Sequence, residues 1–329
     1  MIVPANRQNA GRAAGMLLLA TAFWGGSFLV MKALGQAQSG LMERGGSWLT
    51  SSVSLAIRFA FSAMALALWQ GRSHRSFTRL EWLEGGGLGL FCGGGLLFQM
   101  DGVMHTSAST SAFLTQCYCV FIPVAQAWHH RKLPSKRLAG GCLMVMTGVV
   151  ILANVDWIGF RLGRGETESI IGSIFFTAQI LWLERPAFAA NRVEATTTIM
   201  FAVVALAALS VAVGSGAETR TILAAYHSWV AIALIAFLTL ASTLAAYTMM
   251  NRWQRYVPAA EAGLIYCCEP VFTSVYALFL PGWLSVMAGI QYANETPTPR
   301  QMFGGGLILA ANALVLWPSA KTKPGLANG

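Results

Sequence analysis

The sequence predicts an all-α membrane protein with ten transmembrane helices arranged as two inverted five-helix repeats. The composition, the spacing of the apolar segments and the placement of the basic residues all lead to this prediction. Of the 329 residues, 55% are hydrophobic and only 11% are charged, whereas soluble domains carry roughly 25% charged residues. The mean hydropathy is +0.57, so little of the chain is left for a water-facing domain.

Ten apolar stretches are long enough to cross a bilayer, which takes about 20 residues of helix. The first follows Arg7 and Arg12 but ends without a clean small-residue cleavage site, so we interpret it as a retained helix and not as a signal peptide. The predicted helices cover residues 14–34, 50–70, 84–103, 107–128, 137–155, 168–188, 195–214, 227–249, 259–281 and 301–318.

The net charge of +9 does not indicate nucleic-acid binding, because the basic residues fall in short clusters between the apolar segments. If both termini are cytoplasmic, most of the 22 Lys and Arg residues lie in cytoplasmic loops, as Arg131 and Lys132 do. Positive residues are retained inside, so this orientation is favoured. An even number of helices follows from it. The short loops favour a bacterial inner membrane.

The two halves of the chain look related. Residues 110–114 and 118–123 align with residues 260–264 and 268–272 at an offset of about 150, and a Gly-rich helix follows each. Copies separated by five helices have opposite orientations in the membrane. Inverted repeats are typical of secondary transporters, whose binding site lies near the midplane between the halves. The sequence therefore predicts one repeat over residues 1–158 and a second over residues 159–329.

Two ionisable residues, Arg58 and Glu269, lie deep inside predicted helices. A charge there is costly, so it normally faces a cavity or a partner. Arg58 could hold a substrate carboxylate, and Glu269 could bind an ammonium group or exchange a proton. Alternatively, the two residues pair with each other or with backbone groups and hold helices together.

Further candidates surround these two charges. Pro270 cannot donate a backbone hydrogen bond, so we expect it to kink the ninth helix beside Glu269; the kink either frees carbonyl groups for a ligand or is a tolerated bend. Tyr266 and Glu269 are three residues apart and share a helix face. Aromatic and amide side chains elsewhere are candidate cavity walls, although packing is an alternative for each: Tyr118, Trp24, Gln99, Gln116, Gln179, Trp182 and Tyr247.

No residue pattern indicates a cofactor or a metal. The six cysteines all lie in apolar segments, which favours packing over disulfides or a metal site. His129 and His130 are followed by Arg131 and lack further obvious ligands, so we interpret them as part of a cytoplasmic loop. Gly85, Gly89 and Gly93 recur every four residues and predict a surface where another helix approaches closely.

Taken in order, these residues resemble the drug/metabolite transporter superfamily of the EamA type. The resemblance rests on residues 22–28 (AFWGGSF), on Arg58, on the passage from Gln99 to Leu114, and on residues 269–272 (EPVF). The sequence departs from the family pattern at His129-His130 and in an apparent insertion over residues 283–294.

The resemblance implies ten helices around a central cavity and the export of amino acids or other metabolites, without ATP. The deep cation Arg58 and the deep anion Glu269 would suit a zwitterion, so amino acids or related zwitterions are the expected substrates. A multidrug or organic-cation exporter of the same fold is the main alternative, followed by a channel or an intramembrane enzyme. The sequence lacks a His-Glu-x-x-His motif or another nucleophile–base pair, so we do not expect an enzyme. The expected partners are a small-molecule substrate and the lipid bilayer, not nucleic acid, and a homodimer remains open.

Overall fold

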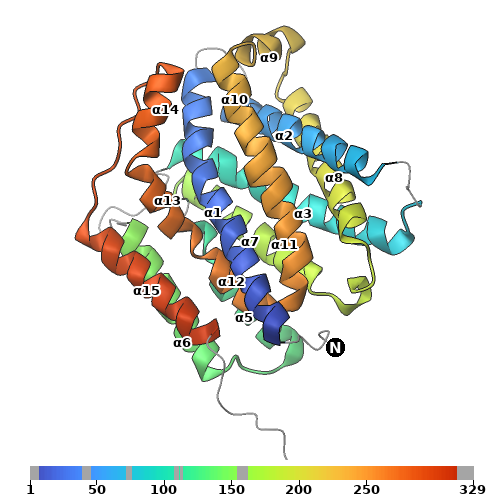
Figure 1. Cartoon of the computed structure of the whole chain (residues 1–329), viewed down its shortest axis with the longest axis vertical. Coiled ribbons are helices and arrows are strands. Elements are labelled where there is room, and N and C mark those ends of the chain that lie inside the picture. The colour runs from blue at the N-terminus through green and yellow to red at the C-terminus, as the bar shows by residue number, and fades with distance from the viewer. Residues whose placement is uncertain are drawn as a thin grey trace, which may run out of the picture.

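The structure, a computed structural model, describes residues 7–38, 46–71, 76–106, 111, 114–153 and 162–316. These residues form helices and connecting turns, with no strand among them, and the helices pack side by side in a bundle (Figure 1). The elements are α1 (Arg7–Gln38), α2 (Gly46–Gln70), α3 (Arg79–His105), α5 (Tyr118–His130), α6 (Lys136–Ala153), α7 (Arg164–Leu183), η2 (Pro186–Phe188), α8 (Val193–Gly214), α9 (Thr219–Ala225), α10 (Trp229–Phe237), η3 (Leu238–Ala245), α11 (Ala246–Trp253), η4 (Gln254–Tyr256), α12 (Ala259–Tyr266), α13 (Glu269–Ala277), α14 (Leu280–Ala288) and α15 (Pro299–Leu316).

Five helical stretches in the described chain are long and apolar enough to cross a membrane. They are Ala10–Gln38, Gly46–Gln70, Arg79–His105, Val193–Gly214 and Trp229–Tyr256, and the bent pair Ala259–Ala277 with Leu280–Ala288 makes a sixth. The helices α5, α6, α7 and α15 also lie in predicted segments but do not meet the same test of length and hydropathy. The all-helical class is therefore confirmed, while the layout of ten spans stays a prediction.

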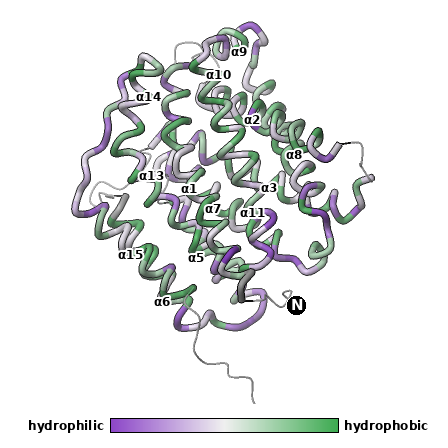
Figure 2. The backbone as a smooth tube through the Cα atoms, viewed as in Figure 1, coloured by the Kyte–Doolittle hydropathy of each residue, from purple (hydrophilic) through white to green (hydrophobic). Residues whose placement is uncertain are grey.

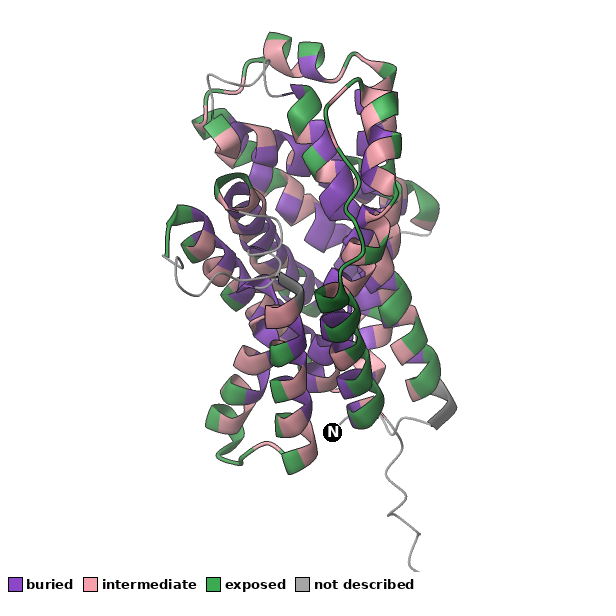
Figure 3. Ribbon diagram, turned by 90° about the vertical axis from the view of Figure 1, so that its left-hand side faces the viewer, coloured by how far each residue is buried: buried purple, intermediate pink, exposed green. Residues whose placement is uncertain are grey.

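The distribution of hydrophobic and hydrophilic residues along the helices suits a bilayer. Hydrophobic residues run along the helices, and hydrophilic residues gather at helix ends and loops (Figure 2). Buried residues line the interior of the bundle, while exposed ones face outward (Figure 3). Many exposed residues are large and apolar, such as Leu90, Leu206 and Trp283. This outer surface suits lipid, where a helix also satisfies its own backbone groups.

Two antiparallel helix pairs join the halves of the chain. The end of α2 meets the start of α8, where the Gln70 side-chain amide donates to Thr198 Oγ1 at 2.8 Å. The start of α6 meets the end of α15, where Arg137 Nε donates to the Leu314 carbonyl at 2.7 Å. Each pair matches a predicted segment with the segment five places later in the chain.

The predicted glycine surface on α3 lies against α8. A Cβ atom at Gly85 would lie 2.6 Å from the Thr196 carbonyl oxygen, and one at Gly89 would lie 2.6 Å from Val203 Cβ. Close packing at these two positions is confirmed, because only glycine leaves room for the neighbouring helix. At Gly93 the nearest atom would be 3.6 Å away, so the contact there is an ordinary one.

The fourth and ninth predicted helices are not continuous. In the fourth, a turn at Gln116–Cys117 precedes α5; residues 107–110 and 112–113 of that prediction lie outside the described residues. In the ninth, a turn at Cys267–Cys268 separates α12 from α13. Pro270 lies in the first turn of α13, where its missing N–H has no helical partner to lose. The break therefore precedes Pro270, and the 62° bend of this segment lies farther on, between Ala277 and Leu280.

The segment that looked like an insertion forms α14 and an extended return. The helix ends at Gly289, whose φ of +64° is the left-handed conformation typical of a helix C-terminus. The return to α15 is attached to the ninth segment, because the Glu295 backbone N–H donates to the Ala277 carbonyl at 2.8 Å.

Candidate functional site

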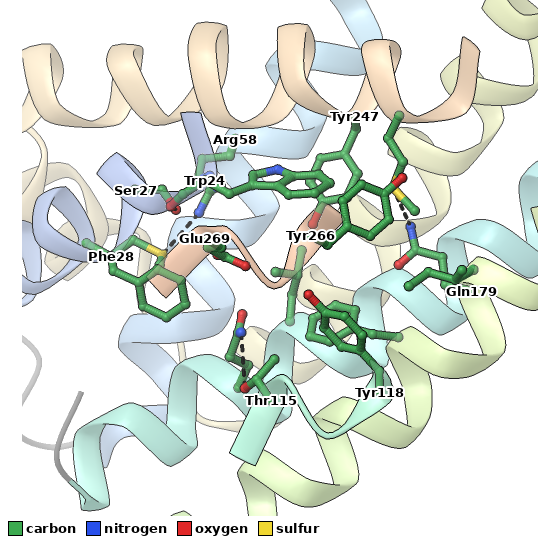
Figure 4. A pocket seen from close by; sticks show the side chains of 16 residues that line it. Trp24, Ser27, Phe28, Arg58, Thr115, Tyr118, Gln179, Tyr247, Tyr266 and Glu269 are labelled. Atoms are coloured by element: carbon green, nitrogen blue, oxygen red, sulfur yellow. Dashed lines mark hydrogen bonds between the residues drawn. The ribbon is translucent and has the colours of Figure 1, made fainter. Parts of the chain in front are cut away.

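A small cavity lies in the interior of the bundle, where α1, α2, α3, α5, α7, α11 and the α12–α13 break meet. Its volume is about 60 Å³, which is small beside typical ligand pockets of roughly 300–1,000 Å³. Figure 4 shows the side chains around it. They are Trp24, Ser27, Phe28, Met31, Arg58, Leu96, Gln99, Thr115, Tyr118, Phe176, Gln179, Ile180, Tyr247, Met250, Tyr266 and Glu269.

Arg58 of α2 supplies the positive charge of this cavity. The residue is only 2% exposed. Its Nε donates to Thr243 Oγ1 at 3.1 Å, and its Nη1 lies 3.4 Å from Met31 Sδ. Neither partner carries a charge, so nothing in these two contacts neutralises the guanidinium.

Glu269 supplies the negative charge from the first position of α13. The α12–α13 turn places its backbone at a helix N-terminus, whose partial positive charge favours a carboxylate. The side chain is 9% exposed and lines the cavity. Its Oε2 accepts a long hydrogen bond of 3.4 Å from Gln116 Nε2. The direct pairing of Arg58 with Glu269, one of the expected alternatives, is not the arrangement these contacts describe.

Aromatic rings form one wall beside the two charges (Figure 4). Trp24 lies 5.1 Å from the Tyr247 ring centroid and 5.5 Å from that of Tyr266. Its indole N–H donates to the Ser242 carbonyl at 3.1 Å, and the Tyr266 hydroxyl donates to Gln254 Oε1 at 2.8 Å. These bonds fix the rings, so the wall is rigid and presents π faces.

Amides and hydroxyls complete the lining. Gln99 of α3 donates to Thr115 Oγ1 at 3.3 Å, next to the fourth-segment break. Tyr118 lies just beyond that break and is also part of the wall. Gln116 is buried at the same break but reaches the cavity only through its bond to Glu269.

Sequence reasoning identified most of the polar lining. Two predicted candidates, Gln116 and Trp182, do not line the cavity, whereas the others do: Trp24, Arg58, Gln99, Tyr118, Gln179, Tyr247, Tyr266 and Glu269. It missed Ser27 and Thr115, which look like ordinary small helix residues in the sequence. It also missed the π-helical stretch η3, which carries Ser242 and Thr243, the partners of Trp24 and Arg58. Such stretches recur at functional sites but have no simple sequence pattern.

Comparison with known proteins agrees with the family expected from the sequence. Residues 11–154 match the model of the EamA-like transporter family. An Archaeoglobus fulgidus protein described as an uncharacterized transporter is 26% identical over 222 residues, which cover 67% of this chain and 64% of that protein. A solved structure, described only as a crystal structure of a protein, superposes with a TM-score of 0.65 at 18% identity. It covers 92% of this chain and 96% of its own, and it supports the fold.

The predicted resemblance to EamA-like transporters is thereby confirmed, through a match that spans the first part of the chain. Together with the apolar helices, it identifies a multi-pass membrane protein.

Proposed function

We propose that this protein is a secondary transporter that exports amino acids or related zwitterions by alternating access through the central cavity. One observation carries the proposal: a guanidinium and a carboxylate line the same buried cavity while bonded to other, uncharged groups. A zwitterion carries one charge of each sign and would complement both. Intramembrane charges of this kind are typical of substrate pathways.

The helix packing supports alternating access. Copies of an inverted repeat run antiparallel, as α2 with α8 and α6 with α15 do. We propose that residues 1–158 and 159–329 are these two repeats and that they rock against each other around the cavity. The cavity is too small here for a bulky substrate, so the mechanism requires it to widen when one face opens.

We propose that both termini lie in the cytoplasm of a bacterium and that the protein spans its inner membrane, as the distribution of basic residues favours. Export then moves substrate to the outer face. No step of this mechanism needs a cofactor or a chemical reaction of the substrate. The partners are the substrate and the lipid bilayer, with a homodimer left to experiment.

Export of organic cations is the second candidate, and the aromatic wall favours it. Trp24, Tyr247 and Tyr266 lie close together beside a carboxylate, as in sites that bind quaternary ammonium groups. Arg58 argues against it, because a second cation in the cavity would be repelled.

Counterflow in liposomes with purified protein tests both candidates. We expect saturable exchange of radiolabelled amino acids and weak competition by cationic dyes. Transport of dyes with no amino-acid exchange would favour the cation exporter. Unsaturable flux would indicate a channel, and chemical conversion of the substrate an enzyme.

A further inference from the structure

A second polar cluster, in which two buried acids share an exposed arginine, lies away from the cavity where the end of α3 meets the start of α7. Asp101 is fully buried, and Glu168 is 8% exposed. Arg164 bridges both acids: its Nη2 donates to Asp101 Oδ2 at 2.5 Å, and its Nε donates to Glu168 Oε1 at 2.9 Å. In the proposed topology this junction lies at the outer end of the bundle.

The bonds to Arg164 leave one oxygen of each acid unused. Asp101 Oδ1 and Glu168 Oε2 are both buried and have no hydrogen-bond partner among the described residues. Because the single guanidinium of Arg164 bonds to both acids, the two carboxyl groups lie next to each other. Two ionised carboxylates cannot bond to each other, because neither has a donor, and burial makes unpaired oxygens costly.

A single bound proton would supply the donor that the two carboxylates lack. We propose that Asp101 and Glu168 form a proton-binding site, in which one proton is held between two buried carboxyl groups at the α3–α7 junction. The proton adds to a carboxylate oxygen of one acid and is donated to the facing oxygen of the other. No other bond changes. Two carboxylates, one guanidinium and one proton then sum to zero charge, which suits a buried site.

A metal ion is a poorer occupant. The described residues contain no group of three or more side chains that could hold one. Arg164 already takes the place of a cation beside both acids.

Two further titratable groups, His105 and Glu166, adjoin the pair. On α3, His105 Nε2 lies 3.6 Å from Asp101 Oδ2 and 3.0 Å from the Ser47 hydroxyl of α2. On α7, Glu166 is fully engaged elsewhere, because it accepts from the Gly163 backbone N–H and from Thr106. Residues 39–45, 107–110 and 154–161, which adjoin these elements in the chain, lie outside the described part.

The site gives the proposed transporter a place to bind a proton outside the substrate cavity, and this consequence rests on the proposed function. Separation of α3 from α7 would expose the pair to water and release the proton. Proton release at this end would then accompany opening of the same end.

Infrared difference spectroscopy of the full chain in liposomes tests the site without any substrate. Between acid and alkaline pH we expect the wild type to show a carbonyl component of a protonated carboxyl group that is missing from both Glu168→Gln and Asp101→Asn. Glu166→Gln is the matched control, since it removes a neighbouring carboxyl whose oxygens are already partnered. A wild-type carbonyl spectrum that neither isosteric variant changes would overturn the proposal.

Thermal unfolding gives a second readout. The wild type should lose stability as pH rises, because loss of the proton leaves two facing carboxylates, and Glu168→Gln should lose most of that slope. An unchanged slope in a folded Glu168→Gln variant contradicts the site. Absence of counterflow in the wild type would refute the transporter alone, since neither readout here depends on flux.

Discussion

Two broken helical segments meet beside the cavity, and only one of them brings a charged side chain to the cavity wall. The fourth segment breaks at Gln116–Cys117 and the ninth at Cys267–Cys268, at an offset of about 150 residues. The breaks touch each other, because Gln116 donates to Glu269. Each half of the chain therefore has a helix break at a corresponding position.

The residues just beyond the breaks differ. After the ninth-segment break the chain places Glu269 on the cavity wall. The equivalent position after the fourth-segment break is Cys119, which is fully buried in the apolar core. The ninth-segment break therefore carries a charge that the fourth-segment break lacks. Under the proposed two-repeat architecture, the shared breaks would shape the cavity and Glu269 would set its negative charge.

The largest expected effect tests this asymmetry directly. Glu269→Gln keeps the size of the side chain and removes its charge, so we expect counterflow to fall at least tenfold, which corresponds to about 1.4 kcal/mol or more of lost interaction. Cys119→Ala is the matched control at the equivalent position and should retain most of the flux. Similar flux losses in the two variants would show that the breaks are functionally alike.

The next effect concerns how α1 supports the ninth-segment break. A Cβ atom at Gly25 would lie 2.8 Å from Phe272 Cβ and 3.1 Å from the Glu269 carbonyl oxygen. Gly25→Ala should therefore destabilise the protein by about 1–3 kcal/mol through overpacking, measured as a lower melting temperature. At Gly26 the nearest atom would be 3.6 Å away, so Gly26→Ala should melt at or slightly above the wild-type temperature. If Gly26→Ala melted at a lower temperature than Gly25→Ala, close packing of α1 against α13 at Gly25 would not be what stabilises the protein.

The smallest effect concerns the bond that joins the two breaks. Gln116→Leu removes a single long hydrogen bond to Glu269, worth about 0.5–1.5 kcal/mol at most. We expect a reduction in counterflow of a few fold, clearly less than for Glu269→Gln, with no change in the kind of substrate. A loss as large as that of Glu269→Gln would make Gln116 an equal partner in binding.

Much of the candidate site could be predicted because intramembrane polarity is rare. Arg58 and Glu269 stand out in apolar segments, and both line the cavity. Ser27 and Thr115 could not be found in this way, because hydroxyls in helices usually bond to their own backbone. The Asp101–Glu168 pair was also missed, since the two acids lie far apart in the chain, and neither Asp101 near a helix end nor Glu168 at a helix start looks unusual alone.

The sequence by itself determined the helical class and the approximate place of each helix, because the length and polarity of a segment decide whether it suits a bilayer. It also determined which rare charges must be sheltered. Only the tertiary structure decided where helices break, which stretch adopts π-helical geometry and which buried acids face each other. Those features depend on contacts between distant segments, such as Gln116 with Glu269 and Asp101 with Arg164, and no local pattern encodes them.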